Sequence, residues 1–190
     1  MKKILILNFS PRKKGNCAAL AQLMAEDIKA KGCEAVVYNE PDMNYKGCKG
    51  CGACKKKDVP FCAQKDDFFD LLPLLDECDG IAFLAPVYFG NIPGPAKSFI
   101  DRLYCFFNPA LDKPLFTPKE SKKMAVIFTC GGGSGYENAA NWVGGCFQTC
   151  GVTESVSFVQ NGLNDLWNEE NEAGKAAAAK AKEMADYLIK

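Results

Sequence analysis

Short runs of consecutive apolar residues, each followed by a segment with helical periodicity, constrain the fold of this chain most strongly. The clearest runs are "KKILILNF" (residues 2–9), "GIAFLAPVY" (80–88) and "KMAVIFTC" (123–130). A continuous apolar run without polar alternation is typical of a strand buried on both faces of a parallel sheet. We therefore expect parallel strands with helices packed on both sides.

The segments between these runs complete the pattern. Two further strands are predicted at 34–38 and 152–159, and helices at 17–32, 66–78, 94–107, 136–150 and 172–190. Such alternation favours a doubly wound α/β fold. Five strands in 190 residues favour one flavodoxin-like domain over residues 1–190, with a five-stranded parallel sheet in the order 2-1-3-4-5. Pro73 predicts a kink or a late start of its helix.

A receiver domain is the other doubly wound arrangement to consider. It needs acidic residues at the end of the first strand to hold magnesium, and this sequence has Asn8, Phe9 and Ser10 there. This difference argues against a receiver domain.

Charge and composition exclude several classes of protein. The formal net charge is zero, which argues against a nucleic-acid binder. No apolar run is long enough to cross a bilayer, and the run at residues 4–9 is too short for a signal peptide. We therefore expect a cytoplasmic protein without a nucleic-acid or membrane partner.

The chain has no histidine, which rules out a Ser-His-Asp triad, a Cys-His dyad and any histidine-containing zinc site.

A cysteine-rich segment at 45–64 follows the second predicted strand. It contains Cys48, Cys51, Cys54 and Cys62, and the chain has eleven cysteines in total. Reducing conditions and an odd count argue against a disulfide framework, so a metal site is favoured. The spacing C-x2-C-x2-C is that of the first three cysteines of a bacterial ferredoxin motif, and Cys62 can supply a fourth thiolate. A [4Fe–4S] cluster, zinc or another metal, and no metal remain the three interpretations. The other cysteines are predicted to be reduced thiols, several of them in the core.

Three loops follow the strands whose carboxyl ends should meet at the ligand-binding edge of the sheet. "SPRKKGNC" (10–17) leads into a helix whose N-terminus suits a phosphate, although Asn16 could simply cap that helix. In "APVYFGNIPGP" (85–95), Tyr88 and Phe89 could cover a flat ring, or the loop could be only a rigid connection. "TCGGGSGYEN" (129–138) has three glycines that allow the backbone to approach a ligand. Together the loops favour a planar ligand that carries a phosphate.

The stretches "FSPRKKGNC", "APVYFGNIPGPAKSFIDR" and "TCGGG" resemble those of flavodoxin-like NADPH-dependent FMN reductases. With "CKGCGACKKKDVPFC" added, the chain is most similar to the iron–sulfur flavoproteins within that superfamily. The resemblance implies an FMN site and a [4Fe–4S] cluster on the four cysteines named above. The implied FMN-binding residues are Ser10, Arg12, Lys14, Gly15, Asn16, Cys17, Pro86, Val87, Tyr88, Phe89, Gly90, Asn91, Cys130, Gly131 and Gly132. Cys17 departs from the family pattern, which has Ser or Thr there, and a thiol is the weaker donor.

We therefore expect an oxidoreductase that passes electrons between the cluster and FMN, with no catalytic side chain. The alternatives are an NAD(P)H-dependent FMN or quinone reductase without a cluster, and a non-catalytic flavodoxin-like carrier. The cysteine segment follows the second strand, away from the ring loops, so we expect a homodimer or homotetramer with transfer between chains. NAD(P)H or ferredoxin is the expected donor. Five lysines in the cysteine segment form either a solvated surface or a docking patch for an acidic donor: Lys46, Lys49, Lys55, Lys56 and Lys57.

Overall fold

The computed structural model describes residues 1–57, 59, 61–107, 122–163 and 171–190. Its five strands form one parallel sheet in the order β2-β1-β3-β4-β5, which confirms the predicted flavodoxin-like strand order. The strands are β1 (Lys3–Asn8), β2 (Glu34–Asn39), β3 (Gly80–Pro86), β4 (Lys123–Thr129) and β5 (Glu154–Gln160).

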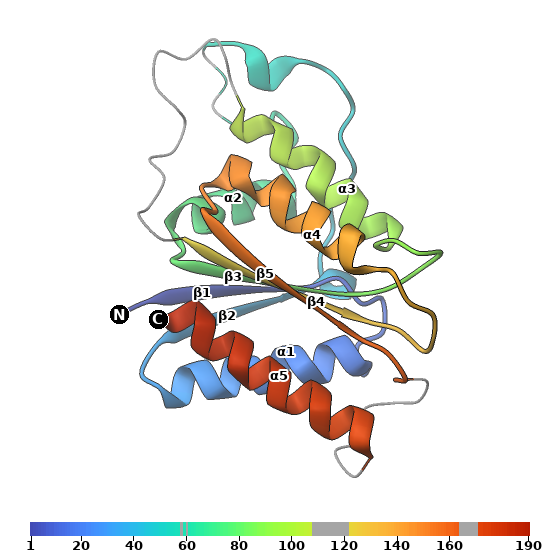
Figure 1. The fold of residues 1–190 in the computed structure, drawn as a ribbon. Helices are drawn as coiled ribbons and strands as arrows, with labels where there is room; N and C mark the ends of the chain where they lie inside the picture. Colours follow the sequence, from blue (N-terminus) through green and yellow to red (C-terminus); the bar gives the residue numbers. More distant parts are fainter. Residues whose placement is uncertain (58, 60, 108–121, 164–170) are drawn as a thin grey trace.

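Helices cover both faces of this sheet. The helices α1 (Asn16–Ala30) and α5 (Glu172–Ile189) lie on one face, and α2 (Asp67–Glu77), α3 (Gly94–Arg102) and α4 (Glu137–Cys146) lie on the other (Figure 1). The short helices η1 (Glu40–Asp42), η2 (Ala53–Lys55), η3 (Leu103–Phe106) and η4 (Phe147–Cys150) occupy connections. Within the described part of the chain, no helix is both long and apolar enough to span a membrane.

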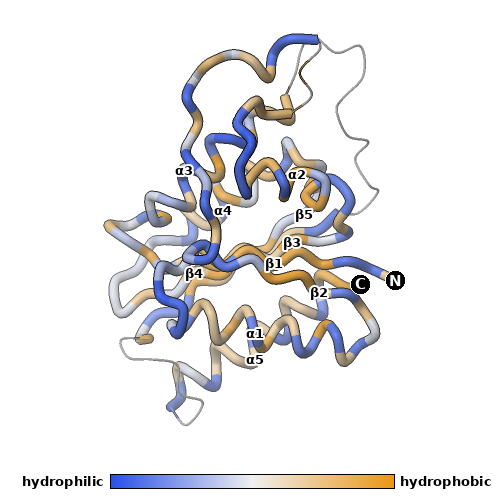
Figure 2. Tube along the Cα trace, turned by 180° about the vertical axis from the view of Figure 1, so that it is seen from behind, coloured by the Kyte–Doolittle hydropathy of each residue, from blue (hydrophilic) through white to orange (hydrophobic). Residues whose placement is uncertain are grey.

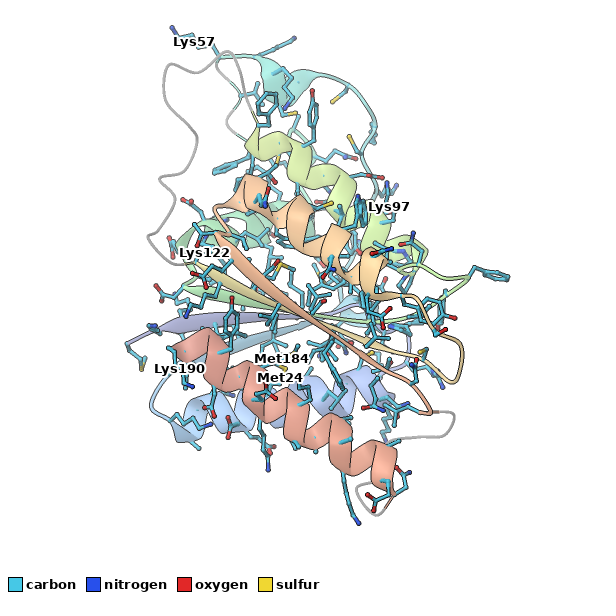
Figure 3. The ribbon with its side chains drawn as sticks, viewed as in Figure 1. Met24, Lys57, Lys97, Lys122, Met184 and Lys190 are labelled. Atoms are coloured by element: carbon cyan, nitrogen blue, oxygen red, sulfur yellow. The ribbon has the colours of Figure 1, made fainter. Side chains whose placement is uncertain are left out.

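The sheet divides the core into two apolar clusters. Every residue of β3 is buried, as its continuous apolar run predicts. On the α1 and α5 face, Met24 and Met184 belong to one cluster and lie close together (Figure 3). On the other face, the ring of Phe99 packs against Phe9 and Phe68 with centroids 5.1 and 4.8 Å apart. Figure 2 shows the hydrophobic colouring concentrated in the sheet between the two helical layers.

The helix ends differ in part from their predicted positions. The helix α1 ends near Gly32, whose φ of 76° is readily adopted only by a residue without a side chain. The predicted helices 94–107 and 136–150 end early and continue as η3 and η4. Pro73 lies inside α2, which begins at Asp67, so a late start of this helix is wrong.

The loops after β1, β3 and β4 gather at the carboxyl edge of the sheet, on the right in Figure 1. The cysteine segment, drawn in cyan, instead runs along the outer side of α3 to the top of the molecule. Lys57 marks its outer tip (Figure 3).

Candidate functional site

The loop between β1 and α1 curls tightly around the start of the helix. Ser10 Oγ accepts a hydrogen bond from the Arg12 backbone N–H at 3.3 Å. A Cβ atom added to Gly15 would lie 3.2 Å from Arg12 Cβ and 3.3 Å from Ser10 Oγ. Among the described residues no side chain caps α1, and its first turn carries no acidic residue. The positive end of α1 is therefore available to an anion, and the absence of a side chain at Gly15 lets Ser10 and Arg12 pack closely against the start of the helix.

Asn16 and Cys17 lie differently from their simplest sequence interpretations. Gly15 is the N-cap of α1, so Asn16 does not cap the helix. Its Nδ2 donates to the Leu163 carbonyl at 3.1 Å, and its buried Oδ1 has no partner among the described residues. The Cys17 sulfur is buried 3.1 Å from Thr129 Oγ1, and burial raises the pKa of this thiol to about 12. The Cys17 thiol is therefore engaged with Thr129, and only the backbone N–H of Cys17 is left to bind a ligand at the N-terminus of α1.

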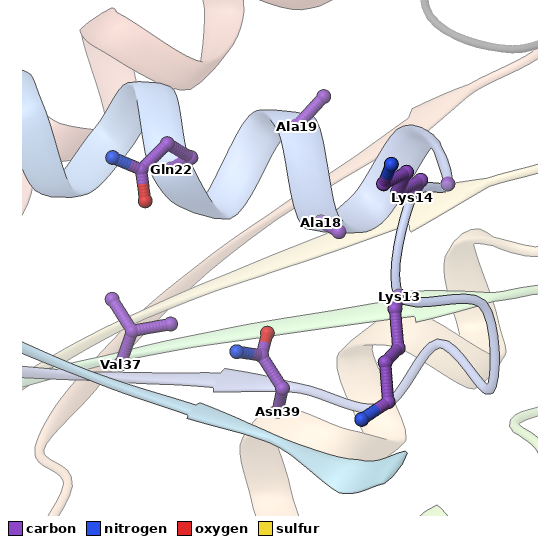
Figure 4. A pocket seen from close by; sticks show the side chains of 8 residues that line it. Lys13, Lys14, Ala18, Ala19, Gln22, Val37 and Asn39 are labelled. Atoms are coloured by element: carbon purple, nitrogen blue, oxygen red, sulfur yellow. The ribbon is translucent and has the colours of Figure 1, made fainter. Parts of the chain in front are cut away.

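Lys14 lies on the β2 side of this loop. It lines a hollow of about 480 Å³ between the start of α1 and the end of β2, together with Gln22 and Asn39 (Figure 4). Lys13 lines the same hollow, and its ammonium group is paired with Asp42. Because the Asp42 carboxylate offsets the charge of Lys13, Lys14 supplies the positive charge on this flank of the loop.

The loop after β3 contains a strained turn. Tyr88 and Asn91 exchange two backbone hydrogen bonds of 2.8 and 3.1 Å. The φ angles are 50° at Phe89 and 79° at Gly90, as in a type I′ turn. The Phe89 side chain is fully exposed. The strained backbone of Phe89 thus holds an aromatic ring in solvent, as a residue that contacts a ligand or partner would need.

The loop after β4 is wrapped around Tyr136. A Cβ atom at Gly133 would lie 2.1 Å from Tyr136 Oη, which donates to the Gly132 carbonyl at 3.4 Å. Cys130 extends the sheet through a backbone bond to Gln160, and its thiol donates to Asn161 Oδ1 at 2.6 Å. Burial raises the pKa of Cys130. The Cys130 thiol is thus already hydrogen-bonded to residues at the end of β5.

The four cysteines of the cysteine segment line one cavity of about 200 Å³ at the C-terminal end of α3, as do Arg102 and Cys105. Gly50 and Gly52 have φ angles of 63° and 67° and turn the chain between the thiols. The Gly50 N–H donates to Cys48 Sγ at 3.4 Å. Burial raises the pKa of Cys54. Within the described residues, no three Cys, Asp or Glu side chains are already arranged to hold a metal ion.

Two basic side chains fix the walls of this cavity: Arg102, from outside the cysteine segment, and Lys55, from within it. Arg102 at the end of α3 hydrogen-bonds Cys62 Sγ at 3.3 Å. Lys55 Nζ donates to the Tyr104 carbonyl at 2.6 Å and lies 3.4 Å from the centre of the Tyr104 ring. Sequence reasoning did not identify Arg102 as part of the site. The only signal for it was a basic residue ending the otherwise amphipathic stretch "KSFIDR".

The helix α3 separates the two candidate sites. The turn with Phe89 precedes its N-terminal end, and the cysteine cavity lies at its C-terminal end. A helix of nine residues is about 13 Å long. The structure thus brings the three loops together, but it places the cysteines away from them.

Comparison with known proteins agrees with this geometry. The model of the NADPH-dependent FMN reductase family matches residues 2–155. The chain belongs to this family. An iron–sulfur flavoprotein of Archaeoglobus fulgidus is 43% identical over 100 residues, which are 53% of this chain and 48% of that protein. One from Methanosarcina thermophila is 36% identical over 100 residues, 53% of this chain and 51% of that protein. The chain thus spans about half the length of the curated relatives it matches.

Solved structures share the fold at low sequence identity. An NAD(P)H:quinone oxidoreductase from Methanothermobacter marburgensis aligns with a TM-score of 0.77 and 14% identity, over 100% of this chain and 98% of that one. An FMN-dependent NADH-azoreductase from Bacillus anthracis, in complex with FMN, aligns with a TM-score of 0.70 and 18% identity over 100% of both chains. The resemblance found in the sequence is confirmed at the level of family and fold.

Proposed function

We propose that this chain is a flavin-dependent oxidoreductase of the iron–sulfur flavoprotein type. It binds FMN at the loops after β1, β3 and β4, and a [4Fe–4S] cluster at Cys48, Cys51, Cys54 and Cys62. One observation carries the proposal: in a chain of the FMN reductase family, three cysteines with ferredoxin-like spacing and a fourth, Cys62, line one cavity. When bound, FMN exchanges one or two electrons and the cluster one at a time.

The described residues fit FMN. The open N-terminus of α1, with Ser10 and Arg12 packed closely beside Gly15, suits the phosphate. The unpaired Oδ1 of Asn16 can only accept a hydrogen bond, so it suits a hydroxyl of the ligand rather than its phosphate. The side chains of Tyr88 and Phe89 remain exposed to cover a ring.

The cysteine cavity fits an iron–sulfur cluster better than a mononuclear metal. Thiolates are soft ligands that suit both zinc and iron–sulfur clusters. A structural zinc site normally uses two separated Cys-x-x-Cys pairs, whereas three of these cysteines are evenly spaced. A cavity of about 200 Å³ also leaves room for more than one metal ion. Binding would require the thiols to lose their protons, including that of Cys54, whose pKa is raised.

The oligomeric state, the electron donor and the cellular location are also part of the proposal. We propose a homodimer or homotetramer, with NAD(P)H or ferredoxin as the donor, in the cytoplasm. The eleven cysteines are all free thiols, which suits a reducing compartment. Lys55 is held against Tyr104 and Phe107, so a docking patch for an acidic donor would rely on its exposed neighbours, such as Lys49 and Lys57. High salt should then slow reduction by ferredoxin.

Replacing one cluster ligand tests the assignment. After anaerobic purification, Cys62→Ser should lose most iron and sulfide and keep its FMN, because the two sites lie at opposite ends of α3. Cys33→Ser is the matched control, since Cys33 is a half-buried thiol before β2 and outside the cavity. Full iron and sulfide in Cys62→Ser would contradict the ligand set. Zinc without sulfide in every variant would favour a reductase without a cluster.

A further inference from the structure

We propose that Arg102 is the positioning residue of the cysteine site. Its buried guanidinium donates an N–H···S hydrogen bond to Cys62, and this bond raises the reduction potential of the cluster held there. The inference rests on the proposed function, and it assigns a role to a side chain outside the cysteine segment.

The guanidinium joins both ends of the cysteine segment to α3. Its Nη1 donates to the Lys46 carbonyl at 3.0 Å, before the first cysteine. Its Nη2 donates to Cys62 Sγ at 3.3 Å and to the Gln64 carbonyl at 3.2 Å, at the far end of the segment. One rigid donor group thereby fixes the position of Cys62 relative to the start of the segment.

Burial makes this charge effective. The Arg102 side chain is 0% exposed, and one carboxylate, Asp66, contacts it at 2.6 Å. The guanidinium carbon lies 4.2 Å from the centre of the Phe68 ring, which shields it from water. A charge in such surroundings acts on its neighbours more strongly than one in solvent.

One donor of Arg102 is still unused. Its Nε is buried and has no hydrogen-bond partner among the described residues, and Arg102 lines the cavity. A buried N–H without a partner is uncommon, because its desolvation is costly. This second observation points to an acceptor that the described residues do not supply, such as a group bound in the cavity.

The direction of the effect follows from charge. Reduction adds negative charge to a cluster, and a positive, hydrogen-bonding group at a ligand sulfur stabilises the reduced form more than the oxidised form. Arg102 should therefore raise the potential, and its loss should lower it.

The hydrogen bond can be tested directly in the unmutated protein. The chain contains only two arginines, Arg12 and Arg102, so labelling arginine with ¹⁵N reports on few groups. In the dithionite-reduced protein, electron–nuclear double resonance should show a ¹⁵N coupling to the cluster. The coupling should persist in Arg12→Lys, because Arg12 lies in the loop after β1. A reduced cluster with no ¹⁵N coupling overturns the proposal.

A potential measurement tests the consequence. Arg102→Lys keeps the charge but loses the planar fork, so the one-electron reduction constant should fall at least tenfold, a downward shift of about 59 mV. Lys97→Gln is the control, because it removes an exposed charge from the same helix. An unchanged potential in Arg102→Lys overturns the proposal. If Arg102→Lys does not fold, the presence or absence of the ¹⁵N coupling in the unmutated protein decides whether the proposal holds.

The two levels of the account fail in different ways. Iron and sulfide without the ¹⁵N coupling would leave the proposed function intact and remove the role of Arg102. Absence of iron and sulfide from the anaerobically purified protein would overturn both.

Discussion

Backbone strain in single residues is found beside the two candidate sites. In the described part of the chain, Phe61 and Phe89 are the non-glycine residues with positive φ. Phe61 directly precedes Cys62, and its ring packs 5.4 Å from that of Phe106. Each such residue costs roughly 1–2 kcal/mol, so the surrounding structure must hold it in place. Strained residues of this kind are expected where the backbone must orient a side chain that binds a ligand.

Gly15 offers a test of the FMN loop. Gly15→Ala should weaken FMN binding roughly tenfold, because the new Cβ would crowd Ser10 Oγ and Arg12 Cβ and displace the loop that is proposed to bind the phosphate. FMN titration followed by flavin fluorescence measures this. Gly145→Ala is the control, because its Cβ would meet nothing within 4 Å. Equal FMN affinity in the two variants would contradict the assignment of this loop.

Asp66 should make the stability of the protein depend on acid pH. Burial opposes ionisation of this carboxyl, but its hydrogen bond to Arg102 prevails and lowers its pKa. A carboxyl with a lowered folded pKa stabilises the protein above its unfolded pKa of about 3.9, and this contribution is lost as pH falls through the folded value.

Asp66→Asn isolates this charge, because Asn still caps α2 well. Urea denaturation from pH 6 to pH 2.5 should show a smaller acid-dependent loss of unfolding free energy in the variant. Identical pH profiles would show that the ion pair with Arg102 does not stabilise the fold.

The sequence revealed some residues of the site and missed others. The cysteines and the glycine-rich loops stand out because their spacing carries the chemistry. The orientation of Cys17 toward Thr129 depends on packing between α1 and β4, which no local pattern encodes. Arg102 was missed because a basic residue at a helix end is usually solvated, and its partner Lys46 is 56 positions away.

At the scale of elements, Lys122 joins helix ends to the sheet. It directly precedes β4 and is buried, and its Nζ donates to the carbonyls of Leu75, Asp76 and Cys150 at 2.8–2.9 Å. These carbonyls lie near the C-terminal ends of α2 and η4, where a positive charge is favourable. The single ammonium therefore holds two connections against the start of β4 (Figure 3).

Lys122→Met should lower the free energy of unfolding by about 2–4 kcal/mol, since it leaves buried carbonyls without donors. The control Lys123→Met should cost less than about 1 kcal/mol, because among the described residues its ammonium group makes a long contact, 5.0 Å from the centre of the Tyr187 ring. Urea denaturation compares the two. Equal losses would show that the three carbonyl contacts contribute little.

The strands and their order were predictable because buried parallel strands read as continuous apolar runs. The path of the cysteine segment was not predictable. It is fixed by long-range contacts, such as the Tyr45 hydroxyl to the Pro95 carbonyl at 2.8 Å and the close approach of Gly47 to Ser98.

At the scale of the whole molecule, α3 places the cysteine cavity and the flavin loops at its two ends. The proposed cluster and FMN sites of one chain are therefore held apart. In the proposed homodimer or homotetramer, the cluster of one chain would instead serve the FMN of its neighbour. This arrangement makes electron transfer depend on assembly.

Mixed oligomers test this dependence. Cys62→Ser should hold FMN without a cluster, and Gly15→Ala, once dialysed against FMN-free buffer to use its weaker affinity, should hold a cluster with little FMN. Exchanging subunits between them should restore cluster-dependent reduction of FMN in roughly half of the dimers, as expected for random pairing of two chains. Stopped-flow absorbance during reduction by ferredoxin measures this. No recovery after verified subunit exchange would place transfer within one chain.

The most direct test of the central claim is the iron, acid-labile sulfide and FMN content of each chain after anaerobic purification. The expected result is about four iron, about four sulfide and about one FMN per chain, with the absorbance of both groups. Zinc or no metal, together with no sulfide, would contradict it and leave an FMN reductase whose cysteines do another task.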